Sequence, residues 1–287
     1  MNKVSVVISA YNEETNIKNC ISSTKELADE IVVVDNSSSD KTLEIAKRSD
    51  ALVFSQENDP LNIDLQKNFG FSKATGDWIL SLDADERITP ELTKEIRSIV
   101  SAKGGWASGP NGYEIPRKNI IFGKWIEHTG WYPDYQLRLF KKGTGKFVSA
   151  KVHEPIVVSG GTEQLSSPMI HENYQSINQF LSRMIVYTES EAQALIEGGY
   201  RLQIMDAIRM PFQEFLRRFF SQEGYKDGIH GLILSLLMSF YHFVIFLKIW
   251  EENKFTRHDK ILDEFTEEAK KIKKEFSFWT KDARKKA

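Results

Sequence analysis

The 287-residue sequence predicts an α/β fold in which a doubly wound, mostly parallel sheet is followed by a C-terminal helical extension. Three observations support this prediction. The first hundred residues alternate between apolar runs and amphipathic segments, turn residues separate short strands between residues 104 and 158, and the periodicity is helical from Ser176 onward. Alternating strands and helices form right-handed βαβ units, which build parallel sheets. We therefore expect two domains, at residues 1–175 and 176–287.

The strands of the first domain are predicted from runs of β-branched residues. Residues 4–9 form a continuous apolar run, as expected of a strand that is buried on both faces. The other expected strands are residues 30–34, 51–54, 78–82, 113–116, 120–125, 136–140 and 155–158. Asn12 precedes two glutamates, and we expect it to be the N-cap of the first helix because asparagine is a preferred cap and acids are favourable in the first turn. Further helices are expected at residues 41–48 and 63–74, and one follows Pro90.

Composition excludes several classes of protein. The chain is 41% hydrophobic and 27% charged with a net charge of −2, so it lacks the broad basic field of a nucleic-acid-binding protein. Its single cysteine, Cys20, excludes an intramolecular disulfide and a cysteine-based zinc cluster, and we expect it to be a small packing residue. The first three residues lead directly into a strand, so we expect no secretory signal peptide and a cytoplasmic protein.

The most informative segment is residues 78–86, an apolar run that ends in Asp83, Asp85 and Glu86. Side chains alternate between the two faces of a strand, so residues i and i+2 point to the same side. We therefore expect Asp83 and Asp85 to lie together at the carboxyl edge of the sheet, where open α/β sheets bind ligands. Two carboxylates there suit Mg²⁺ or Mn²⁺ held with a substrate diphosphate. The alternative is a pair of solvated turn residues before the next helix.

Polar segments also follow the other predicted strands. Residues 9–14 (SAYNEE) follow the first strand, residues 35–40 (DNSSSD) follow the second, and residues 66–70 (QKNFG) open the helix before the aspartates. The first strand is not followed by the G-x-G-x-x-G loop of dinucleotide-binding dehydrogenases, and the sequence has no G-x-x-x-x-G-K-[ST] phosphate loop. These patterns weigh against a dehydrogenase and a P-loop ATPase.

Together these motifs resemble the family 2 glycosyltransferases, inverting enzymes of the GT-A fold that use nucleotide sugars. The matching segments are residues 6–14 (VVISAYNEE), 33–42 (VVDNSSSDKT) and 74–85 (ATGDWILSLDAD), in the order and spacing of the family. Residues 131–140 (WYPDYQLRLF) and 152–154 (VHE) resemble the branch that adds glucose to the inner core of lipopolysaccharide.

The resemblance implies roles for individual residues. Tyr11 and Asp35 are expected to line the nucleobase pocket, by stacking and by a hydrogen bond to uracil N3–H. Asp83 is expected to contact the ribose or share a metal ion, and Asp85 to bind a divalent ion that neutralises the departing UDP. The residues expected to bind the donor are Ala10, Tyr11, Glu13, Asp35, Gln66, Asp83 and Arg138.

The resemblance also implies a general base, because inversion needs a group opposite the leaving group that takes the proton of the acceptor hydroxyl. The base of the family is often the aspartate of a Glu-Asp pair, and here Pro133 stands where the glutamate is expected. Asp134 is the first candidate and Glu154 the second; the alternative for Asp134 is a turn residue after proline. His153 and His171 are candidates for a further metal ligand, or else structural histidines.

The second domain contains an apolar run at residues 232–249, interrupted by Ser235, Ser239, Tyr241 and His242. Eighteen residues is the lower limit for crossing a bilayer, and the polar interruptions favour a helix that lies in the membrane interface. The alternatives are a buried core helix, a helix that forms a homo-oligomer, and a membrane-spanning helix.

The sequence therefore predicts an inverting hexosyltransferase that moves glucose from UDP-glucose onto a lipid-linked saccharide at the inner face of the cytoplasmic membrane, with Mg²⁺ or Mn²⁺ as cofactor. One alternative is a transferase for another UDP-sugar or acceptor. The other is a non-catalytic nucleotide-sugar-binding protein, against which the intact Asp83, Asp85 and Asp134 argue.

Overall fold

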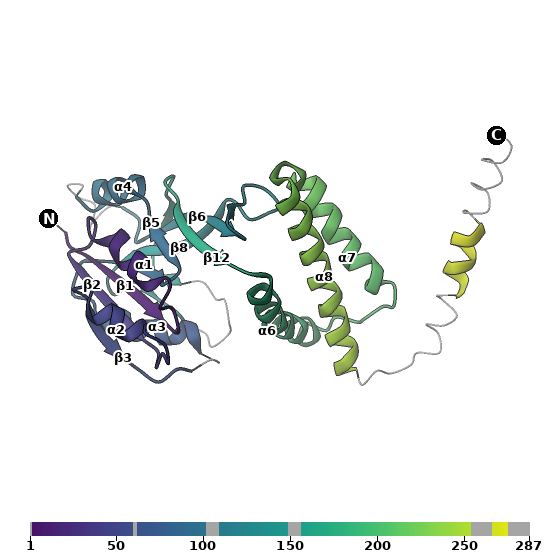
Figure 1. Ribbon diagram of the computed structural model, residues 1–287, viewed down its shortest axis with the longest axis horizontal. Coiled ribbons are helices and arrows are strands. Elements are labelled where there is room, and N and C mark those ends of the chain that lie inside the picture. The colour runs from purple at the N-terminus through teal and green to yellow at the C-terminus, as the bar shows by residue number, and fades with distance from the viewer. Residues whose placement is uncertain (1, 60–61, 102–108, 149–155, 254–265, 275–287) are drawn as a thin grey trace. The chain divides into compact units, whose positions relative to one another are not determined.

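The computed structural model describes residues 2–59, 62–101, 109–148, 156–253 and 266–274 (Figure 1). The chain contains two compact units, residues 1–177 and 178–287. The first unit holds the sheet, and the second is helical.

The sheet of the first unit begins with four parallel strands in the order β3-β2-β1-β4. Their bounds are β1 (Val4–Ala10), β2 (Glu30–Asp35), β3 (Leu52–Ser55) and β4 (Trp78–Asp83). The order continues β8-β6-β12-β5, where β8 is antiparallel to β4 and β6, β12 is parallel to β6, and β5 is antiparallel to β12. The bounds of this half are β5 (Glu86–Ile88), β6 (Gly112–Ile121), β8 (Asp134–Lys141) and β12 (Met169–Tyr174). The predicted doubly wound, mostly parallel sheet is confirmed.

Short strands complete this unit. β7 (Lys124–Trp125) and β11 (Thr162–Gln164) pair with β6, and β9 (Gly145–Lys146) pairs with β10 (Val157–Val158). The expected strands at residues 113–116 and 120–125 are thus one continuous strand, β6, followed by a turn at Phe122 and Gly123 into β7. β6 continues through Pro116.

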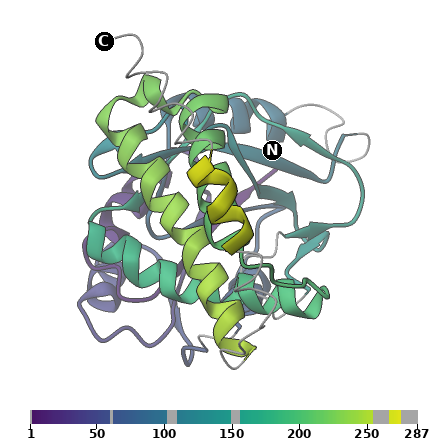
Figure 2. The same ribbon diagram turned by 90° about the vertical axis from the view of Figure 1, so that its right-hand side faces the viewer.

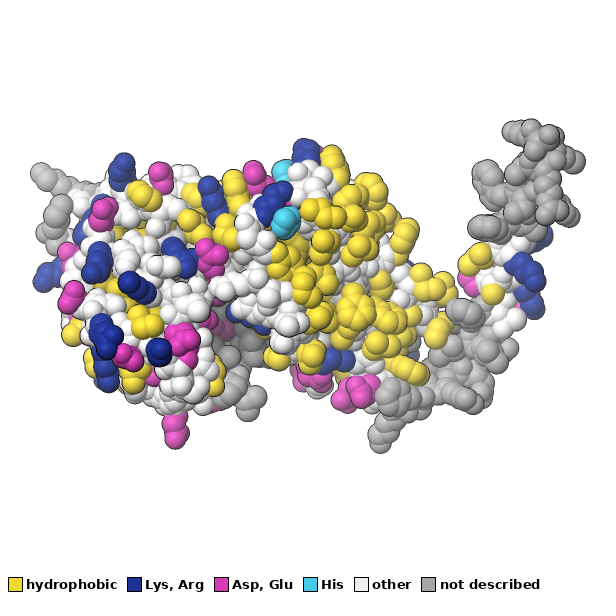
Figure 3. Space-filling view, in the orientation of Figure 1, with side chains coloured by type: hydrophobic (Ala, Val, Ile, Leu, Met, Phe, Trp, Pro, Cys, Tyr) yellow, Lys and Arg dark blue, Asp and Glu magenta, His cyan; other side chains and the backbone are white. Residues whose placement is uncertain are grey.

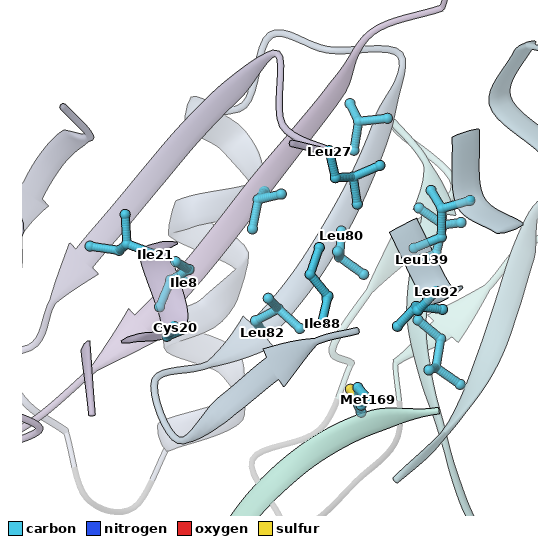
Figure 4. Close-up of a cluster of buried hydrophobic side chains, with 14 of the residues drawn as sticks. Ile8, Cys20, Ile21, Leu27, Leu80, Leu82, Ile88, Leu92, Leu139 and Met169 are labelled. Carbon is cyan, nitrogen blue, oxygen red and sulfur yellow. The ribbon is translucent and has the colours of Figure 1, made fainter. Parts of the chain in front are cut away.

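Alternation along the strands divides the core into two layers, one on each face of the sheet. Val4, Val6 and Ile8 of β1 pack into the cluster that contains α1 (Ile17–Thr24) and α4 (Pro90–Ser101). Figure 4 shows this cluster, in which Ile8, Leu80 and Leu82 of the strands meet Cys20, Ile21 and Leu92 of the helices. Burial raises the pKa of the Cys20 thiol.

The other face of the sheet packs against α3 (Ile63–Lys73). Val7 of β1 and Val32 and Val34 of β2 form a cluster with Phe71 of this helix. The remaining helix of this half, α2 (Thr42–Lys47), lies between β2 and β3 in the chain. Helices therefore cover both faces, as a doubly wound sheet requires.

The prediction that Asn12 caps the first helix was wrong. α1 begins at Ile17 with Asn16 as its N-cap. Asn12 has a φ of 55°, and its side-chain oxygen accepts a hydrogen bond of 2.8 Å from Ser39 N–H. Asparagine tolerates this left-handed conformation, so its side chain joins two loops at the sheet edge and is not available to cap the helix.

Between residues 177 and 253 the structure describes three long helices, α6 (Ile177–Glu197), α7 (Asp206–Leu216) and α8 (Ile229–Glu252). A π-helical segment (Arg217–Ser221) continues α7, and a short 3₁₀ helix (Gly224–Asp227) precedes α8. By length and composition α8 could cross a membrane: it has 24 residues and a mean hydropathy of 2.1.

Gly76 offers a test of the packing between β1 and the segment that enters β4. A Cβ at Gly76 would lie 2.7 Å from Ser5 Oγ, 2.8 Å from Ser5 N and 3.0 Å from Lys3 O. Two of these atoms are backbone and cannot move without disturbing β1, so Gly76→Ala is expected to destabilise the first unit by about 1–3 kcal/mol. Urea unfolding followed by circular dichroism measures this loss. Gly161→Ala is the control, because a Cβ there meets nothing within 4 Å; equal stability of the two variants would contradict the packing argument.

Candidate active site

The candidate site lies at the edge where β1, β2 and β4 end. The register pairs Ala10 with Asp35 and Ser9 with Asp83, so the ends of these three strands lie side by side. β8 runs antiparallel to β4, so its first residue, Asp134, lies toward the same edge. The topology thus brings together segments that are more than a hundred residues apart in the sequence.

Asp35 and Tyr11 occupy the β1–β2 part of this edge. Asp35 is only 2% exposed; one carboxylate oxygen accepts a 3.3 Å hydrogen bond from Ser38 N–H, and the other has no hydrogen-bond partner among the described residues. A buried acceptor without a donor costs free energy, so this oxygen favours a ligand that brings an N–H group. Tyr11 follows the strand end and is half exposed, with its ring available for stacking.

Glu13 and Asn36 fix the loops that carry these two residues. Glu13 N–H donates to Thr42 Oγ1 at 2.7 Å, and the Glu13 carboxylate accepts from Asn16 Nδ2 at 2.8 Å. Asn36 Nδ2 donates to the Ala10 carbonyl at 3.2 Å, which joins the ends of β1 and β2. The Glu13 side chain therefore shapes the loop.

Gln66 and Lys67, at the start of α3, have different partners. The Gln66 side chain holds the loop after β3, since its Oε1 accepts from Asp59 N–H at 3.1 Å and its Nε2 donates to the Glu57 carbonyl. Lys67 Nζ instead forms ion pairs with Asp83 at 2.7 Å and with Asp64 at 3.3 Å. The lysine, which the sequence analysis did not select, is the residue of this helix that reaches the aspartate motif.

Both carboxylate oxygens of Asp83 are ion-paired. Oδ1 contacts Lys67 Nζ and Oδ2 contacts Arg138 Nη2, each at 2.7 Å. Burial alone would raise the pKa of the Asp83 carboxyl, but the charges of Arg138 and Lys67 hold it well below its ordinary value. The ionised form of Asp83 is therefore favoured by its two cationic partners.

Arg138 links Asp83 to Glu86. Its Nη2 is 2.6 Å from Glu86 Oε1, and the second oxygen of Glu86 accepts a 2.9 Å hydrogen bond from the backbone N–H of Asp83. Glu86 is fully buried and Arg138 is 6% exposed. Despite the cost of burial, the two carboxylates raise the pKa of the guanidinium above its ordinary value, so Arg138 is a permanent buried charge that holds the turn between β4 and β5.

Asp134 is held by side chains of two antiparallel strands. Arg117 lies directly opposite it in the β6–β8 register, and Arg117 Nη2 is 2.6 Å from Asp134 Oδ2. Asn119 Nδ2 donates to the same oxygen at 3.1 Å, and Gln136 Nε2 donates to the other at 2.9 Å. Burial would raise the pKa of the Asp134 carboxyl, but Arg117 and these hydrogen bonds lower it below its ordinary value.

Asp85 is positioned differently from Asp83. β4 ends at Asp83 and β5 begins at Glu86, so Asp85 lies in a two-residue turn and the i, i+2 alternation of a strand does not apply to it. Asp85 is 8% exposed, and its Oδ2 is 3.5 Å from His171 Nε2 on β12. The two aspartates thus contact different partners.

The hydrogen bonds of Asn119 fix the tautomer of His171. Asn119 Nδ2 donates to the Trp131 carbonyl and to Asp134, so its Oδ1 is the acceptor that faces His171 Nδ1 at 2.7 Å. Nδ1 therefore carries a proton, and Nε2, which faces Asp85, is the nitrogen that would offer a lone pair to a metal ion.

This donor pair fits a divalent ion that also binds substrate. A carboxylate oxygen and an imidazole nitrogen are ligands that Mn²⁺ and Mg²⁺ accept, and such ions often take their other ligands from phosphates and water. Among the described residues there is no group of three His, Cys, Asp or Glu side chains that could hold a metal.

Several site residues could not be selected from the sequence. Arg117, Asn119 and Gln136 lie on β6 and β8, whose sequences predicted only short apolar strands. The pattern that could have identified these residues is the polar residue at every second position. Glu86 was noticed only as a neighbour of the aspartates. His153 and Glu154, the third metal candidate and the second base candidate, lie outside the described residues.

Comparisons with known proteins identify the family. The model of "Glycosyl transferase family 2" matches residues 5–146, which include β1 to β8. An uncharacterized glycosyltransferase of Rickettsia typhi is 28% identical over 88% of each chain. The lipopolysaccharide core biosynthesis glycosyltransferase LpsC of Rhizobium meliloti is 24% identical over 91% of this chain and 96% of LpsC. Among solved structures, S. aureus TarS 1–349 in complex with UDP-GlcNAc has a TM-score of 0.46 and 16% identity, covering 84% of this chain and 81% of TarS. Residues 5–146 are therefore a family 2 glycosyltransferase domain, and the relatives that match most of the chain are glycosyltransferases.

Proposed function

We propose that this glycosyltransferase inverts the anomeric carbon while it transfers glucose from UDP-glucose to a lipid-linked saccharide at the cytoplasmic face of the membrane. The observation that carries the proposal is the position and charge of Asp134. It is an ionised carboxylate at the edge where β4 ends, and it is held there by Arg117, Asn119 and Gln136. A single in-line displacement needs such a base.

In the proposed reaction Asp134 takes the proton from the acceptor hydroxyl as the oxygen attacks C1 of the sugar. The bond between C1 and the β-phosphate oxygen breaks, and UDP leaves with its electron pair. The new bond forms on the face opposite the leaving group, so an α-linked donor gives a β-linked product. Arg117 keeps Asp134 ionised before the reaction and oriented toward the edge.

The donor nucleotide is assigned to uridine from the environment of Asp35. Its unpartnered carboxylate oxygen, buried beside the half-exposed ring of Tyr11, suits the N3–H donor of uracil. Ala10 and Glu13 hold the loop that frames this pocket. Asp83 fixes the strand end beside it through Lys67 and Arg138.

Asp85 and His171 are the residues that would hold a divalent ion, which when bound would neutralise the negative charge of the diphosphate. Asn119 holds the proton on His171 Nδ1, so Nε2, which faces Asp85, is the nitrogen that would offer a lone pair to the ion. Asp83 does not need to be a ligand for this arrangement, because its two oxygens already have cationic partners.

The acceptor is proposed from likeness. LpsC, which is similar over nearly its whole length, is named as a lipopolysaccharide core biosynthesis enzyme. A direct test is transfer of radiolabelled glucose from UDP-glucose to lipopolysaccharide core acceptors that lack one hexose, with UDP-GlcNAc as the competing donor. Transfer from UDP-GlcNAc alone, or hydrolysis without any acceptor, would contradict the proposal.

Asp85 is expected to be essential for metal-dependent binding of UDP. In calorimetric titrations with Mn²⁺, Asp85→Ala should weaken UDP binding by about tenfold or more, because the ion loses its only described carboxylate ligand. The difference should vanish when EDTA is added. Asp50→Ala is the control, since that carboxylate is almost fully exposed and pairs only loosely with Lys25 at 3.9 Å. Unchanged Mn²⁺-dependent binding by Asp85→Ala would rule out the metal role.

Arg117 is expected to set the acid limb of the pH profile. The pKa of Asp134 is depressed, so wild-type kcat/KM should hold down to a pH below the ordinary range of an aspartate. Arg117→Gln removes the paired charge and raises this pKa, so the acid limb should move to higher pH by about one unit. Arg87→Gln, which breaks a 3.0 Å ion pair with Glu172, is the matched control.

Asp134→Asn complements the pH measurement. It should lower kcat by about 10²–10⁴-fold with little change in UDP affinity, since the base acts only in the transition state. If Asp134→Asn retained most of its turnover, or if Arg117→Gln and Arg87→Gln had the same pH profile, Asp134 would not be the base.

A further inference from the structure

Exposed apolar side chains gather on the helical unit. Of the large hydrophobic residues that are exposed, twelve lie between residues 178 and 253 and only six lie in the described part of the much longer first unit. Those of the helical unit are Ile185, Val186, Ile208, Phe212, Leu216, Phe220, Tyr225, Ile229, Ile233, Leu236, Phe240 and Trp250. Large exposed hydrophobic patches mark interaction surfaces.

α8 presents one apolar side outward. Its exposed residues Ile229, Ile233, Leu236 and Phe240 recur at intervals of three or four, so they lie on one side of the helix. The polar residues of α8 have partners within the unit. Ser239 Oγ donates to the Pro211 carbonyl at 2.8 Å, and Tyr241 Oη donates to Glu191 at 2.6 Å.

α7 adds a second apolar stripe. Ile208, Phe212 and Leu216 recur at intervals of four and are 37–60% exposed. α7 packs along α8, and Figure 3 shows hydrophobic side chains spread continuously over both helices, with charged groups at the border of the area; Figure 2 gives the same helices from the side. A surface two helices wide differs from a coiled-coil seam, which is one narrow stripe. We call this area the α7–α8 face.

Exposed cations accompany the α7–α8 face. Three of its apolar residues are each followed directly by a half-exposed basic residue: Ile208 by Arg209, Leu216 by Arg217 and Tyr225 by Lys226. Long basic side chains beside an apolar surface can extend to the phosphates of lipid headgroups while their methylene groups stay in the apolar layer. Each of these cations is ion-paired with an acid three residues before it, Asp206, Glu214 or Glu223, so the border carries basic and acidic groups together.

We infer that the α7–α8 face binds the surface of a phospholipid bilayer, with α8, which has a mean hydropathy of 2.1, lying in the interface. Glu191 and Glu214 explain why α8 does not cross. Glu191 accepts the hydrogen bond of Tyr241, and Glu214 is 3.7 Å from His242, both in the middle of α8. A spanning α8 would take these carboxylates into hydrocarbon, which is costly. The inference concerns the second unit alone and does not depend on the proposed donor or acceptor.

The test is co-sedimentation of the full chain with vesicles of phosphatidylcholine containing 30% phosphatidylglycerol or none. Leu236→Asp should reduce the fraction bound to anionic vesicles about tenfold or more, because a buried leucine contributes about 1.5–3 kcal/mol and 1.4 kcal/mol is tenfold. Leu52→Asp is the matched control: Leu52 lies on β3 and is 52% exposed, against 53% for Leu236.

UDP binding and thermal unfolding, measured on each variant, show that it is folded. Loss of vesicle binding in Leu236→Asp with retention in Leu52→Asp supports the inference. Absence of vesicle binding by the wild type overturns it, and a dimer in sedimentation equilibrium that Leu236→Asp dissociates would identify a second copy of the chain as the occupant. Resistance of the bound protein to extraction by alkaline carbonate would overturn the interfacial position and indicate a spanning helix.

Discussion

The buried guanidinium of Arg138 is the group on which the geometry of the catalytic edge depends. A charge buried without partners costs many kcal/mol, so a buried pair depends on hydrogen bonds to its other polar atoms. Both oxygens of Glu86 have partners, because one contacts Arg138 and the other accepts from the Asp83 backbone, whereas Arg138 Nε has no hydrogen-bond partner among the described residues. The acid therefore holds both the cation and the turn that carries Asp85. Removal of either partner would leave the other buried charge with only its second, remaining counter-ion, Asp83 for Arg138 or Arg117 for Glu86.

From this pair a chain of alternating charges extends in both directions. Every cation in it is shared between two acids, in the order Asp64, Lys67, Asp83, Arg138, Glu86, Arg117 and Asp134. The chain connects α3, the β4–β5 turn and the two antiparallel strands, and a second polar link runs from Asn119 of β6 through His171 to Asp85. We infer that the two aspartates of the motif have separate roles, Asp83 as an internal anion of the network and Asp85 as a ligand beside His171.

How much of this was predictable depends on the range of the interaction. Strand and helix positions follow from local periodicity, so the doubly wound sheet and the edge position of Asp35 and Asp83 were predicted correctly. The partner of Asp134 depends on the β6–β8 register, which the sequence does not encode in any local pattern. The conformation of Asn12 was missed for a related reason. Its best hydrogen bond is to Ser39, 27 residues away, and local capping preference does not include that competitor.

In the helical unit, too, the role of several residues depends on partners that are distant in the sequence. In the sequence, Ser239, Tyr241 and His242 are interruptions in an apolar run and reduce its suitability for crossing a membrane. In the structure these residues face α6 and α7. Ser239 contacts Pro211, Tyr241 contacts Glu191, and His242 contacts Glu214. The interruptions therefore locate the inward side of α8, and the uninterrupted positions between them locate the outward side. A polar residue in a hydrophobic helix therefore marks the side of the helix that packs against its neighbours. The exposed apolar side is then the side that lacks such residues.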